Sequence, residues 1–550
     1  MISIRSRKTG TCILRALVLV SLLSCSGFAT VRDVTSFGAT GDGSHDDTSA
    51  IQSAIAAMGS GDELFFPCGS AGIYKVSSLL RITAQNSTVD GATGCSGGRV
   101  TIRGSFSGGT LFLVGGGGTS SATGLTADAA ELSTTFAANL SALGGVGAGD
   151  YVNLQEGGID GASANTDPST CDSAGPCRGE VLKVASASGS TAAIDTSVQT
   201  TPGLHFAFNT ANGANVRKLL NVVSGCSIHD LTFDGSGTVQ VGLSLQTVVD
   251  CALKNLTVQN FTGSAVNESE GYNNSWSSVS VNHGGGNGGG NGSAFNIQLH
   301  GHDQINGVTL SSLNLHGFGF FIGGGADSTI GNLTVDATGT TQARAVKANA
   351  EAYSTWNSLT ERNGDPTYNG LSLEYYASHN TFNDCSITNN GPGGAQGKGI
   401  NTFGNYNQFN TFNNCTVTGN GGWAFGQGQS ALGSFQDSNT TINGGTWRSS
   451  NSADDVLHLA SASTYVHNAT IGGPGATGIS LTGNNGCINS NIFLAGSGLS
   501  AGISVSGSGN VGSGSTLNGF SSNLPGGTCG SGSAGGGPPV PPTGLAAVVH

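Results

Sequence analysis

The chain has 550 residues but little charge: Asp, Glu, Lys and Arg make up 9% of it, against roughly 25% in an average globular protein. Its net charge of −13, with no Lys/Arg cluster beyond the N-terminal segment, argues against nucleic acid as a partner. It also argues against a strongly anionic substrate unless a cation such as Ca²⁺ mediates the contact. Glycine is abundant at 93 residues, and regularly spaced Val, Ile, Leu and Phe argue against disorder. This composition predicts an all-β chain with many tight turns that hold Gly or Asn at positive φ.

Residues 1–29 are typical of an export signal. A basic start precedes the apolar run 16–23, which is too short to span a bilayer. The segment 22–25 also resembles a bacterial lipoprotein box, which would leave Cys25 as a lipid-bearing first residue. We therefore expect a secreted protein, with lipid anchoring at Cys25 as the alternative, and no other segment that crosses a membrane.

The next segment, residues 30–118, is predicted to hold an N-terminal cap and the first coils of a stack. Residues 31–58 indicate a short strand, a Gly-rich turn and a helix that begins near Ser44 to Asp47. The apolar stripe of this helix consists of Ile51, Ala54, Ile55 and Met58. The acidic residues of the turn favour capping and turn formation over catalysis. We expect the helix to cover the open end of the stack, where core and strand edges would otherwise be exposed.

The sequence VRDVTSFGATGDGSHDDT, residues 31–48, closely resembles the N-terminal signature of the pectate-lyase-like superfamily. Its members are single-stranded right-handed parallel β-helix proteins, and they include polygalacturonase-like hydrolases, rhamnogalacturonases, epimerase-like proteins and phage tailspikes. The resemblance implies this fold for the chain and a polysaccharide as its partner, and it leaves the reaction open. Because tailspike-like relatives are trimers, a homotrimer is a further expectation.

Between residues 119 and 206 the coil pattern stops. Residues 149–154 and 180–184 alternate between apolar and polar side chains, as half-buried antiparallel strands do. We therefore predict a small β insertion between early coils. Such an insertion either overhangs a binding groove or has a purely structural role.

Residues 207–530 are predicted to form the regular coils. The phrase NTFNDCSIT at 380–388 returns as NTFNNCTVT at 410–418, and looser copies follow at a mean step of 26 residues. The copies centre on Leu231, Leu256, Val279, Leu313, Leu333, Leu359, Cys385, Cys415, Gly445, Ala469 and Asn491. A repeat of this length indicates stacked coils, in which like residues lie above one another.

Asparagines recur within this pattern, at Asn255, Asn332, Asn383, Asn413 and Asn468. The sequence predicts that they form a ladder of turn residues, which is a structural role. After residue 500 the pattern dissolves, and residues 531–550 are typical of a Gly/Pro-rich linker and tail.

Ten cysteines remain once residues 1–29 are removed, an even number in a chain expected to be exported. Neighbours along the chain form the pairs Cys68/Cys95, Cys171/Cys177, Cys226/Cys251, Cys385/Cys415 and Cys487/Cys529. Two cysteines at the same place in successive coils would lie about 4.8 Å apart. We predict disulfides for Cys171/Cys177 and for about half of the other pairs, with free buried thiols as the alternative. No cysteine spacing indicates a zinc site.

Ionisable residues are densest between residues 344 and 398. If Val346 aligns with Leu371, Lys347 lies beside Ser372, and Glu351 lies about one coil from Glu374. Glycoside hydrolysis requires two carboxylates about 5–9.5 Å apart, so Glu374 and Glu351 are candidate catalytic residues. The expected substrate-binding residues are Lys347, Arg362, Tyr375, Tyr376 and His379. The alternative is a solvated face with ordinary ion pairs.

A second pair of carboxylates, Asp454 and Asp455, lies in the sequence ADDVLHL. It resembles the paired-aspartate coil of polygalacturonase-like hydrolases, and this resemblance implies acid and water-activating roles for the two residues. The chain departs from that pattern in the neighbouring coils. Gly421-Gly422-Trp423 stands one coil upstream in place of Asn-Thr-Asp, and the following coil lacks Gly-His-Gly. The alternative is a turn that holds two acids.

A third group, His300, His302 and Asp303, offers potential metal ligands, but a surface turn is favoured and no metal site is predicted. We expect an exported glycoside hydrolase that cleaves polysaccharide with paired carboxylates. Two alternatives stay open. One is a non-catalytic glycan-binding or adhesive surface protein. The other is a polysaccharide lyase, which would use a base such as Lys347 or Arg362 together with Ca²⁺. No other cofactor is expected.

Overall fold

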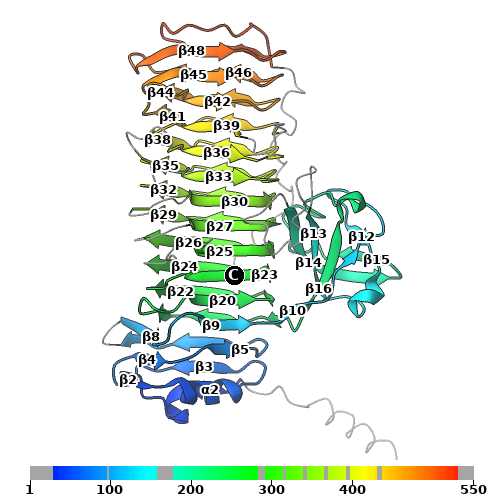
Figure 1. Ribbon diagram of the computed structural model, residues 1–550, viewed down its shortest axis with the longest axis vertical. Helices are drawn as coiled ribbons and strands as arrows, with labels where there is room; N and C mark the ends of the chain where they lie inside the picture. Colours follow the sequence, from blue (N-terminus) through cyan, green and yellow to red (C-terminus); the bar gives the residue numbers. More distant parts are fainter. Residues whose placement is uncertain are drawn as a thin grey trace, which may run out of the picture.

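The computed structural model describes residues 29–95, 98–157, 177–282, 292–311, 313, 317–338, 344–364, 369–391, 397–404, 406–429 and 437–529. Within these residues the chain is all-β with one α-helix, and it winds into a parallel β-helix of about 16 turns. Figure 1 shows the coils stacked along the long axis, with a small β insertion at one side. The parallel β-helix predicted from the repeat and from the N-terminal resemblance is confirmed. None of the helices in the described part of the chain has the length and apolar character needed to cross a membrane.

In the described part of the chain two sheets run along the stack, sheet A with 27 strands and sheet B with 15, and almost all of their pairings are parallel. Sheet B contains one long row of strands, about one per coil. This row is β5 (Leu80–Ile82), β9 (Thr110–Gly115), β20 (Val241–Gln246), β23 (Val266–Tyr272), β25 (Gly292–Gly301), β27 (Gly317–Ala326), β30 (Arg344–Ala352), β33 (Leu371–Glu374), β36 (Ile400–Phe403), β39 (Phe425–Gln429), β42 (Leu457–Leu459), β45 (Gly475–Leu481) and β48 (Leu499–Val505).

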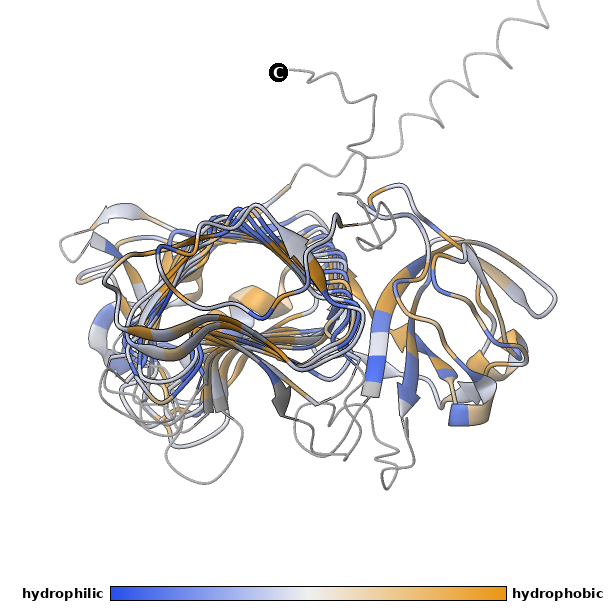
Figure 2. Ribbon diagram, turned by 90° about the horizontal axis from the view of Figure 1, so that it is seen from above, coloured by the Kyte–Doolittle hydropathy of each residue, from blue (hydrophilic) through white to orange (hydrophobic). Residues whose placement is uncertain are grey.

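Side chains of sheet B alternate between the interior and the outer face, as the strand pleat requires. One inward column, part of the apolar core, contains Phe295, Phe320, Val346, Leu371, Ile400 and Phe425. The next column points outward and contains Asn296, Phe321, Lys347, Ser372, Asn401, Gly426 and His458. Figure 2 shows the stack end-on, with the coils superimposed on one another. The register therefore makes neighbours of residues that are distant in sequence.

In sheet A the repeated phrase forms two short strands separated by two residues, the first of which is in the left-handed conformation. β34 (Thr381–Asn383) and β35 (Ser386–Thr388) flank Asp384 at φ 53°, and β37 (Thr411–Asn413) and β38 (Thr416–Asn420) flank Asn414 at φ 54°. The same conformation recurs at Asp230, Asn255, Ser278, Gly307, Asn332, Ser358, Asp384, Asn414, Gly444, Asn468 and Ser490. Gly, Asn and Asp tolerate this φ best, which explains why Gly, Asn, Asp or Ser directly precedes the centre of each copy.

One centre of the predicted repeat is wrong. The fourth copy centres on Val308 and not on Leu313, because β24 (Ser275–Asn282) and β26 (Gln304–Ser311) pair Val279 with Val308. Leu313 is also fully buried, so it fits the apolar pattern although it does not pair with Val279.

Two of the predicted turn asparagines, Asn383 and Asn413, precede the left-handed residue and do not occupy it. Their side chains form an amide ladder between coils instead. Asn413 Nδ2 donates to Asn383 Oδ1 at 2.9 Å, and Asn383 Nδ2 donates to Asn357 Oδ1 at 2.9 Å. The role remains structural, and it acts through side chains rather than through the backbone.

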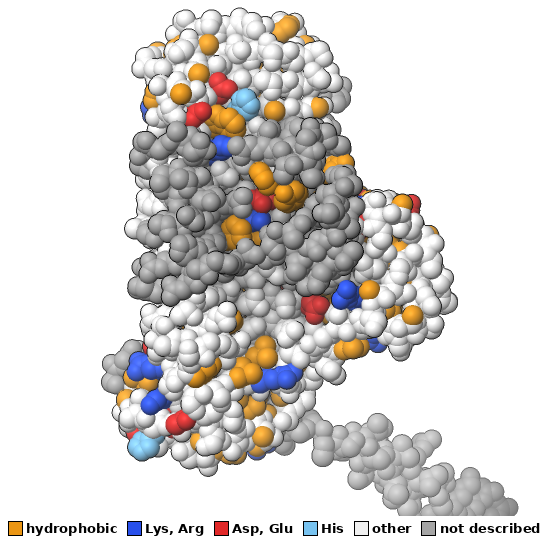
Figure 3. All heavy atoms as spheres, viewed as in Figure 1, with side chains coloured by type: hydrophobic (Ala, Val, Ile, Leu, Met, Phe, Trp, Pro, Cys, Tyr) orange, Lys and Arg blue, Asp and Glu red, His pale blue; other side chains and the backbone are white. Residues whose placement is uncertain are grey.

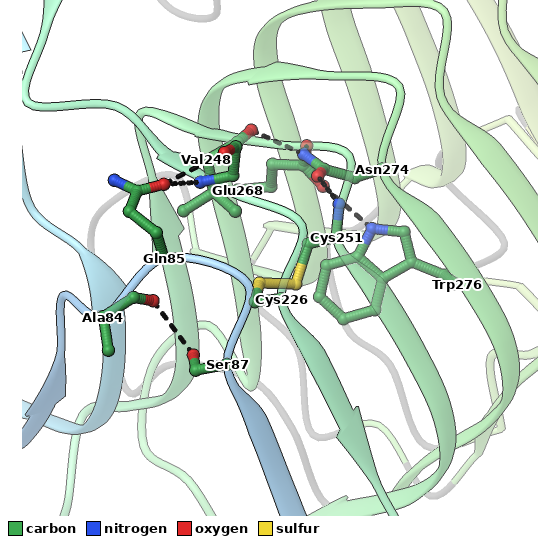
Figure 4. Close-up of a disulfide and its surroundings, with 10 residues drawn as sticks. Ala84, Gln85, Ser87, Cys226, Val248, Cys251, Glu268, Asn274 and Trp276 are labelled. Carbon is green, nitrogen blue, oxygen red and sulfur yellow. Dashed lines mark hydrogen bonds between the residues drawn. A yellow bond between two sulfur atoms is a disulfide. The ribbon is translucent and has the colours of Figure 1, made fainter. Parts of the chain in front are cut away.

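All four of the other cysteine pairs form disulfides, where about half were expected: Cys68–Cys95, Cys226–Cys251, Cys385–Cys415 and Cys487–Cys529. Figure 4 shows Cys226–Cys251, which joins two coils close to Trp276. The indole Nε1 of Trp276 donates to the buried carboxylate of Glu268 at 2.8 Å. Residue 171 of the predicted Cys171–Cys177 pair lies outside the described residues.

Near the N-terminus, α2 (Thr48–Ala56) buries Ile51 and Ala54 in the core of the first coils. The residues before it form a strand, β2 (Asp42–Asp46), where the sequence indicated a turn and the start of the helix. Asp47 accepts hydrogen bonds from the backbone N–H groups of Thr40 at 2.7 Å and Gly41 at 3.2 Å. Its carboxylate therefore holds the Gly-rich turn closed.

The insertion is an antiparallel β-sheet with a core of its own. Its strands are β10 (Gly118–Thr119), β11 (Thr123–Gly124), β12 (Thr135–Ala137), β13 (Tyr151–Gly157), β14 (Cys177–Ser188), β15 (Thr191–Ile194) and β16 (Asn215–Leu220). Its core continues onto Ala326, Ala350 and Ala352 of the β-helix. Asp327 of the β-helix also accepts hydrogen bonds from the backbone N–H groups of Thr200, at 2.7 Å, and Thr201, at 3.2 Å. The insertion is thus fixed to the side of the stack.

Glu361, on β32 (Thr360–Arg362), is a carboxylic acid in the interior. Its Oε2 accepts a hydrogen bond from Asn390 Nδ2 at 2.7 Å, and burial raises its pKa from 4.5 to about 8. Between these two pH values the folded state keeps a proton that the unfolded chain releases. The stability that this group contributes is therefore complete below about pH 4.5 and is lost as pH rises towards 8.

We predict that Glu361→Gln, which keeps the acceptor for Asn390 but cannot ionise, is more stable than the wild type at pH 8. The difference should be on the order of 1–4 kcal/mol at pH 8 and should shrink towards zero near pH 4.5, because one pKa unit corresponds to about 1.4 kcal/mol. Urea unfolding at several pH values measures it. A difference that does not change with pH would contradict the assignment of a buried neutral acid.

Candidate functional site

The outer face of sheet B carries the first group of predicted site residues. As the alignment of Val346 with Leu371 implied, Lys347 lies beside Ser372, and Asn349 lies beside Glu374. Lys347 Nζ is 3.0 Å from Glu374 Oε2, and Ser372 Oγ donates to Glu374 Oε1 at 2.7 Å. Both side chains of the ion pair are almost fully buried, with 3% and 2% exposed. This pair is well satisfied within the protein.

Aromatic rings flank this ion pair. Lys347 Nζ lies 4.7 Å from the centroid of the Phe318 ring and 5.4 Å from that of Phe321. Ring faces attract an ammonium group, and they compensate part of the cost of removing it from water. Lys347 and Glu374 therefore form a fixed, charge-balanced group on the outer face.

Glu351 points the other way, into the interior of the stack. Its Oε2 is 2.9 Å from Nε2 of His300, and Ser354 Oγ donates to its Oε1. The alternation of β30 is reversed at Ala350, which has φ 48°. Glu351 and Glu374 consequently lie on opposite sides of the sheet, and the structure does not bring them together around one ligand.

The third predicted group, His300, His302 and Asp303, is also split between the interior of the stack and its outer side. His300 Nδ1 lies 3.2 Å from Asp303 Oδ2 in the interior, and both side chains are fully buried. The charges of Glu351 and Asp303 outweigh burial and raise the pKa of His300 to about 10. His302 instead bonds Asp327 at 2.8 Å, beside the insertion. These residues do not form one metal site.

The remaining predicted binding residues lie apart from Lys347. Arg362 is 51% exposed on sheet A and pairs with Asp336 at 2.9 Å. Tyr376 stacks on Tyr406, with ring centroids 4.9 Å apart, and lies under Arg178 of the insertion.

His379 and Tyr375 contact other aromatic rings. The His379 ring is stacked between Tyr353 at 4.3 Å and Phe409 at 4.6 Å. Tyr375 meets Phe403 edge-on at 5.8 Å. Tyr375 and Tyr376 both pack on the core of the insertion, and His379 stacks on Tyr353, which packs there too. All three residues therefore serve the contact between the β-helix and the insertion.

The second group, Asp454 and Asp455, gathers three further side chains from neighbouring coils. Trp423 and His458 are stacked with ring centroids 4.5 Å apart, and Lys398 Nζ is 4.4 Å from the centroid of the Trp423 ring. Lys398 belongs to the coil before Trp423 and His458 to the coil after it, so the indole lies between the ammonium and the imidazole. His458 Nδ1 is 3.0 Å from Asp455 Oδ2.

Two glycines shape this group. A Cβ at Gly426 would lie 1.9 Å from Trp423 Cε3, so the indole packs directly on the backbone there. A Cβ at Gly422 would lie 3.5 Å from Lys398 Cγ and 3.7 Å from Asp454 Oδ2, so these two side chains flank Gly422. We call Lys398, Trp423, Asp454, Asp455 and His458 the upper cluster.

Burial tunes the ionisable groups of the upper cluster. It lowers the pKa of Lys398 from 10.5 to about 8, against the opposing effect of the Asp454 charge. Burial also raises the pKa of Asp454, although Asn451 Nδ2 donates to its Oδ2 at 2.8 Å and opposes the shift. A carboxyl with a raised pKa and an amine with a lowered pKa are the kinds of group that exchange protons with a substrate.

Asn401 lies on the outer face between the two groups, next to Ser372 on one side and Gly426 on the other. It is 1% exposed, and neither Nδ2 nor Oδ1 has a hydrogen-bond partner among the described residues. Figure 3 shows this face of the molecule, where charged and histidine side chains lie next to hydrophobic ones along the strands. The face thus offers an unused amide beside two sets of ionisable groups.

Trp423 and His458 were not singled out from the sequence. The strand register identifies them. Trp423 aligns with Asp455 of the next coil, and Gly426 aligns with His458 of that same coil. Sequence alone does not give this alignment, because the intervening turns differ in length. Elsewhere, Asp90, His229 and Asp230 are close enough to hold a metal ion, among the described residues, but they lie on sheet A.

Proteins of similar structure have low sequence identity to this chain. The tailspike protein gp49 of Pseudomonas phage LKA1 is 17% identical, with 90% of this chain and 81% of that one covered and a TM-score of 0.45. The mannuronan C-5 epimerase AlgE6 A-module of Azotobacter vinelandii is 14% identical, with 88% and 99% covered and a TM-score of 0.44. The catalytic unit of a GH87 α-1,3-glucanase from Streptomyces thermodiastaticus is 12% identical, with 92% and 71% covered and a TM-score of 0.33.

A comparison with curated proteins finds no match. Residues 31–117 match the family model described as rhamnogalacturonase A/epimerase, pectate lyase-like. The resemblance predicted from residues 31–48 is thereby confirmed.

We predict that Trp423→Ala raises the pKa of Lys398 from about 8 towards 10.5, because the indole covers the ammonium and burial is what lowers this pKa. An NMR titration with ¹³C-labelled lysine follows the Nζ-bearing carbon directly. Lys75, which lies far away on β4 (Ile73–Val76), serves as the internal control. An unchanged titration of Lys398 would show that other groups desolvate it.

Proposed function

We propose that this pectate-lyase-like β-helix protein is an exported glycoside hydrolase that cleaves a polysaccharide on the outer face of sheet B. The observation that carries the proposal is the upper cluster. In a chain with 9% charged residues, two consecutive carboxylates lie there beside a lysine, a histidine and a tryptophan drawn from three successive coils. The match of residues 31–117 to a rhamnogalacturonase/epimerase model supports a carbohydrate as the substrate class.

Asp454 and Asp455 are the proposed catalytic pair. Asp454 is the general acid, because burial raises its pKa and keeps its proton available for the leaving oxygen. Asp455 is the second carboxylate, which activates water or attacks the sugar, and the contact with His458 at 3.0 Å orients it. Hydrolysis of a glycosidic bond needs these two roles and no cofactor.

Substrate binding is assigned to the neighbouring outward residues. The amide of Asn401 supplies a donor and an acceptor that the described part of the protein leaves unused, and sugar hydroxyls satisfy both. Removal of a buried amide from water without a partner costs free energy, so a ligand that pairs with it binds more tightly. Glu374 lies two coils and Lys347 three coils from the Trp423 coil, so this ion pair extends the binding face and does not form the reaction centre.

One observation favours a lyase as the second candidate. Lys398, with a pKa of about 8, is partly unprotonated under mildly alkaline conditions and can act as the base that removes a proton next to a uronate carboxylate. Such a reaction would require a cation, Ca²⁺ being the natural choice, to neutralise that carboxylate. A third candidate is a protein that binds glycans without cleaving them.

Export and assembly are also proposals. Four disulfides are typical of an oxidising compartment, and this agrees with the signal-like residues 1–29. We propose secretion to the cell exterior, with lipid attachment at Cys25 as the alternative and a homotrimer as the assembly to test.

For the hydrolase, we predict that Asp454→Asn and Asp455→Asn each lower the release of reducing ends about 10²–10⁴-fold, the usual contribution of an acid or base group. Activity of the wild type should fall as pH rises through the raised pKa of Asp454, since the general acid must be protonated. The assay uses the purified chain and a panel of neutral and acidic polysaccharides. Asp336→Asn, an acid on sheet A, is the matched control and should retain full activity. Equal activity of both cluster variants and the control would refute the pair.

The lyase is separated from the hydrolase by its product. Elimination creates an unsaturated uronate that absorbs ultraviolet light, and hydrolysis does not. We predict reducing ends without this absorbance, with or without Ca²⁺, and a less than tenfold effect of Lys398→Gln. Absorbance that depends on Ca²⁺, rises through pH 8 and disappears in Lys398→Gln would replace the hydrolase by the lyase. Retention on a polysaccharide column without either product would indicate a binding protein.

A further inference from the structure

A groove at the edge of sheet A lies outside the proposed reaction centre. It crosses three successive coils, from Thr418 in β38 past β41 (Thr446–Ser449) to Pro474, which follows β44 (Thr470–Gly472) closely. Its volume is about 430 Å³, within the usual range of small-molecule sites, and it opens to solvent. Figure 1 shows these strands in the upper part of the stack. The molecule therefore offers both space and access here.

A β-bulge and two glycines shape the groove. β38 and β41 pair with a shift of register between Val417 and Asn420, so two residues of β38 stand opposite Arg448 alone. A bulge of this kind bends its strand and changes the direction of nearby side chains. Gly419, within the bulge, has φ 74°, and Gly473, one coil further, has φ 92°. A Cβ at Gly473 would lie 2.2 Å from a backbone oxygen of the preceding coil, so only glycine fits there.

Arg448 is the charged residue of the groove. Its side chain is exposed, and among the described residues it has no hydrogen-bond or ion-pair partner. Four other arginines lie 2.9–3.2 Å from a carboxylate: Arg32, Arg103, Arg178 and Arg362. No Asp or Glu is among the residues that line the groove. An anion that enters it therefore meets a guanidinium that no acid of the groove neutralises.

Hydroxyl groups lie around this guanidinium. Thr446 points to the same outer face as Arg448, because the residue between them, Trp447, is buried in the core. Thr418 and Ser450 add two further hydroxyls to the lining. A guanidinium presents parallel N–H donors to an oxyanion, and a hydroxyl donates to an oxyanion or bonds a sugar hydroxyl. These groups together suit an anionic substituent on an otherwise neutral sugar.

One turn separates the groove from the upper cluster. Ser449, which lines the groove, donates through Oγ to Gly422 O at 3.2 Å and accepts from Asn451 N at 3.0 Å. Asn451 Nδ2 in turn donates to Asp454 Oδ2 at 2.8 Å. The groove thus lies on the sheet A side of the turn that carries Asp454, and the proposed acid lies on the sheet B side.

We propose that this groove binds the anionic substituent of a glycan, a carboxylate or a sulfate ester, and that Arg448 recognises its charge. The chain as a whole carries a net charge of −13, which repels such a group, so a local cation without a neighbouring acid is needed to hold it. Arg448 lies apart from the proposed catalytic pair, so it selects a ligand and takes no part in bond cleavage. The site does not depend on the reaction proposed above.

Calorimetric titration of the full chain tests the groove. The Asp454→Asn/Asp455→Asn variant is the parent, so that no probe is cleaved. One arm compares hexagalacturonate with its methyl ester, and the other compares a sulfated β-1,4-galactose hexasaccharide with the unsulfated one. We expect the charged member of at least one pair to bind at least tenfold more tightly than its neutral counterpart, and Arg448→Gln to weaken that binding at least tenfold. The arm that responds identifies the anion, and loss of hydrolase activity does not affect the result.

Arg362→Gln is the matched control, because Arg362 is also an exposed arginine of sheet A but pairs with Asp336 at 2.9 Å. It should leave binding unchanged. Arg448→Gln should leave the Tm unchanged, since an exposed side chain without a partner contributes little to stability. Equal binding of charged and neutral probes, no binding of either charged probe, binding that survives Arg448→Gln, or an equal loss in Arg362→Gln would each overturn the proposal.

Discussion

The stacking of one coil on the next, strand paired with strand, is the constraint on which the rest of the structure depends. Each backbone pairing fixes the register of a whole coil, so a residue stands above its counterpart about 4.8 Å away. In the interior this produces columns of like side chains, such as the stacked rings of Trp356, Phe382 and Phe412. On the outer face the same register assembles a site from residues that the chain separates by one or more coils.

The upper cluster illustrates this consequence. Lys398, Trp423 and His458 come from three successive coils and form one stacked column, and Asp455 is attached to it through His458. The scaffold carries few charges. Each ionisable side chain of the upper cluster contacts a specific neighbour: Asp455 contacts His458, Asp454 contacts Asn451, and Lys398 lies against Trp423. Burial there lowers the pKa of Lys398 to about 8 and raises the pKa of Asp454.

The sequence predicted the coils well because their signal is repeated: the phrase at 380–388 and its copies report a backbone conformation that every coil needs. It predicted the site less well, because a site depends on which face of the sheet each side chain points to. Glu351 and Glu374 were paired by spacing, but the left-handed Ala350 turns Glu351 into the interior. The column of Trp423 and His458 needs the true register, which turns of unequal length conceal. The unpaired amide of Asn401 has no sequence signal, because an asparagine with hydrogen-bond partners and one without them are the same residue in the sequence.

The position of a bound oligosaccharide tests the account most directly. A crystal structure of the Asp455→Asn variant with an oligosaccharide of the polymer that the wild type degrades would show it. We predict a sugar on the outer face of sheet B, with a glycosidic oxygen within hydrogen-bond distance of Asp454 and hydroxyls on the amide of Asn401. A sugar bound only to sheet A, or on sheet B without contact to Asp454, would contradict it.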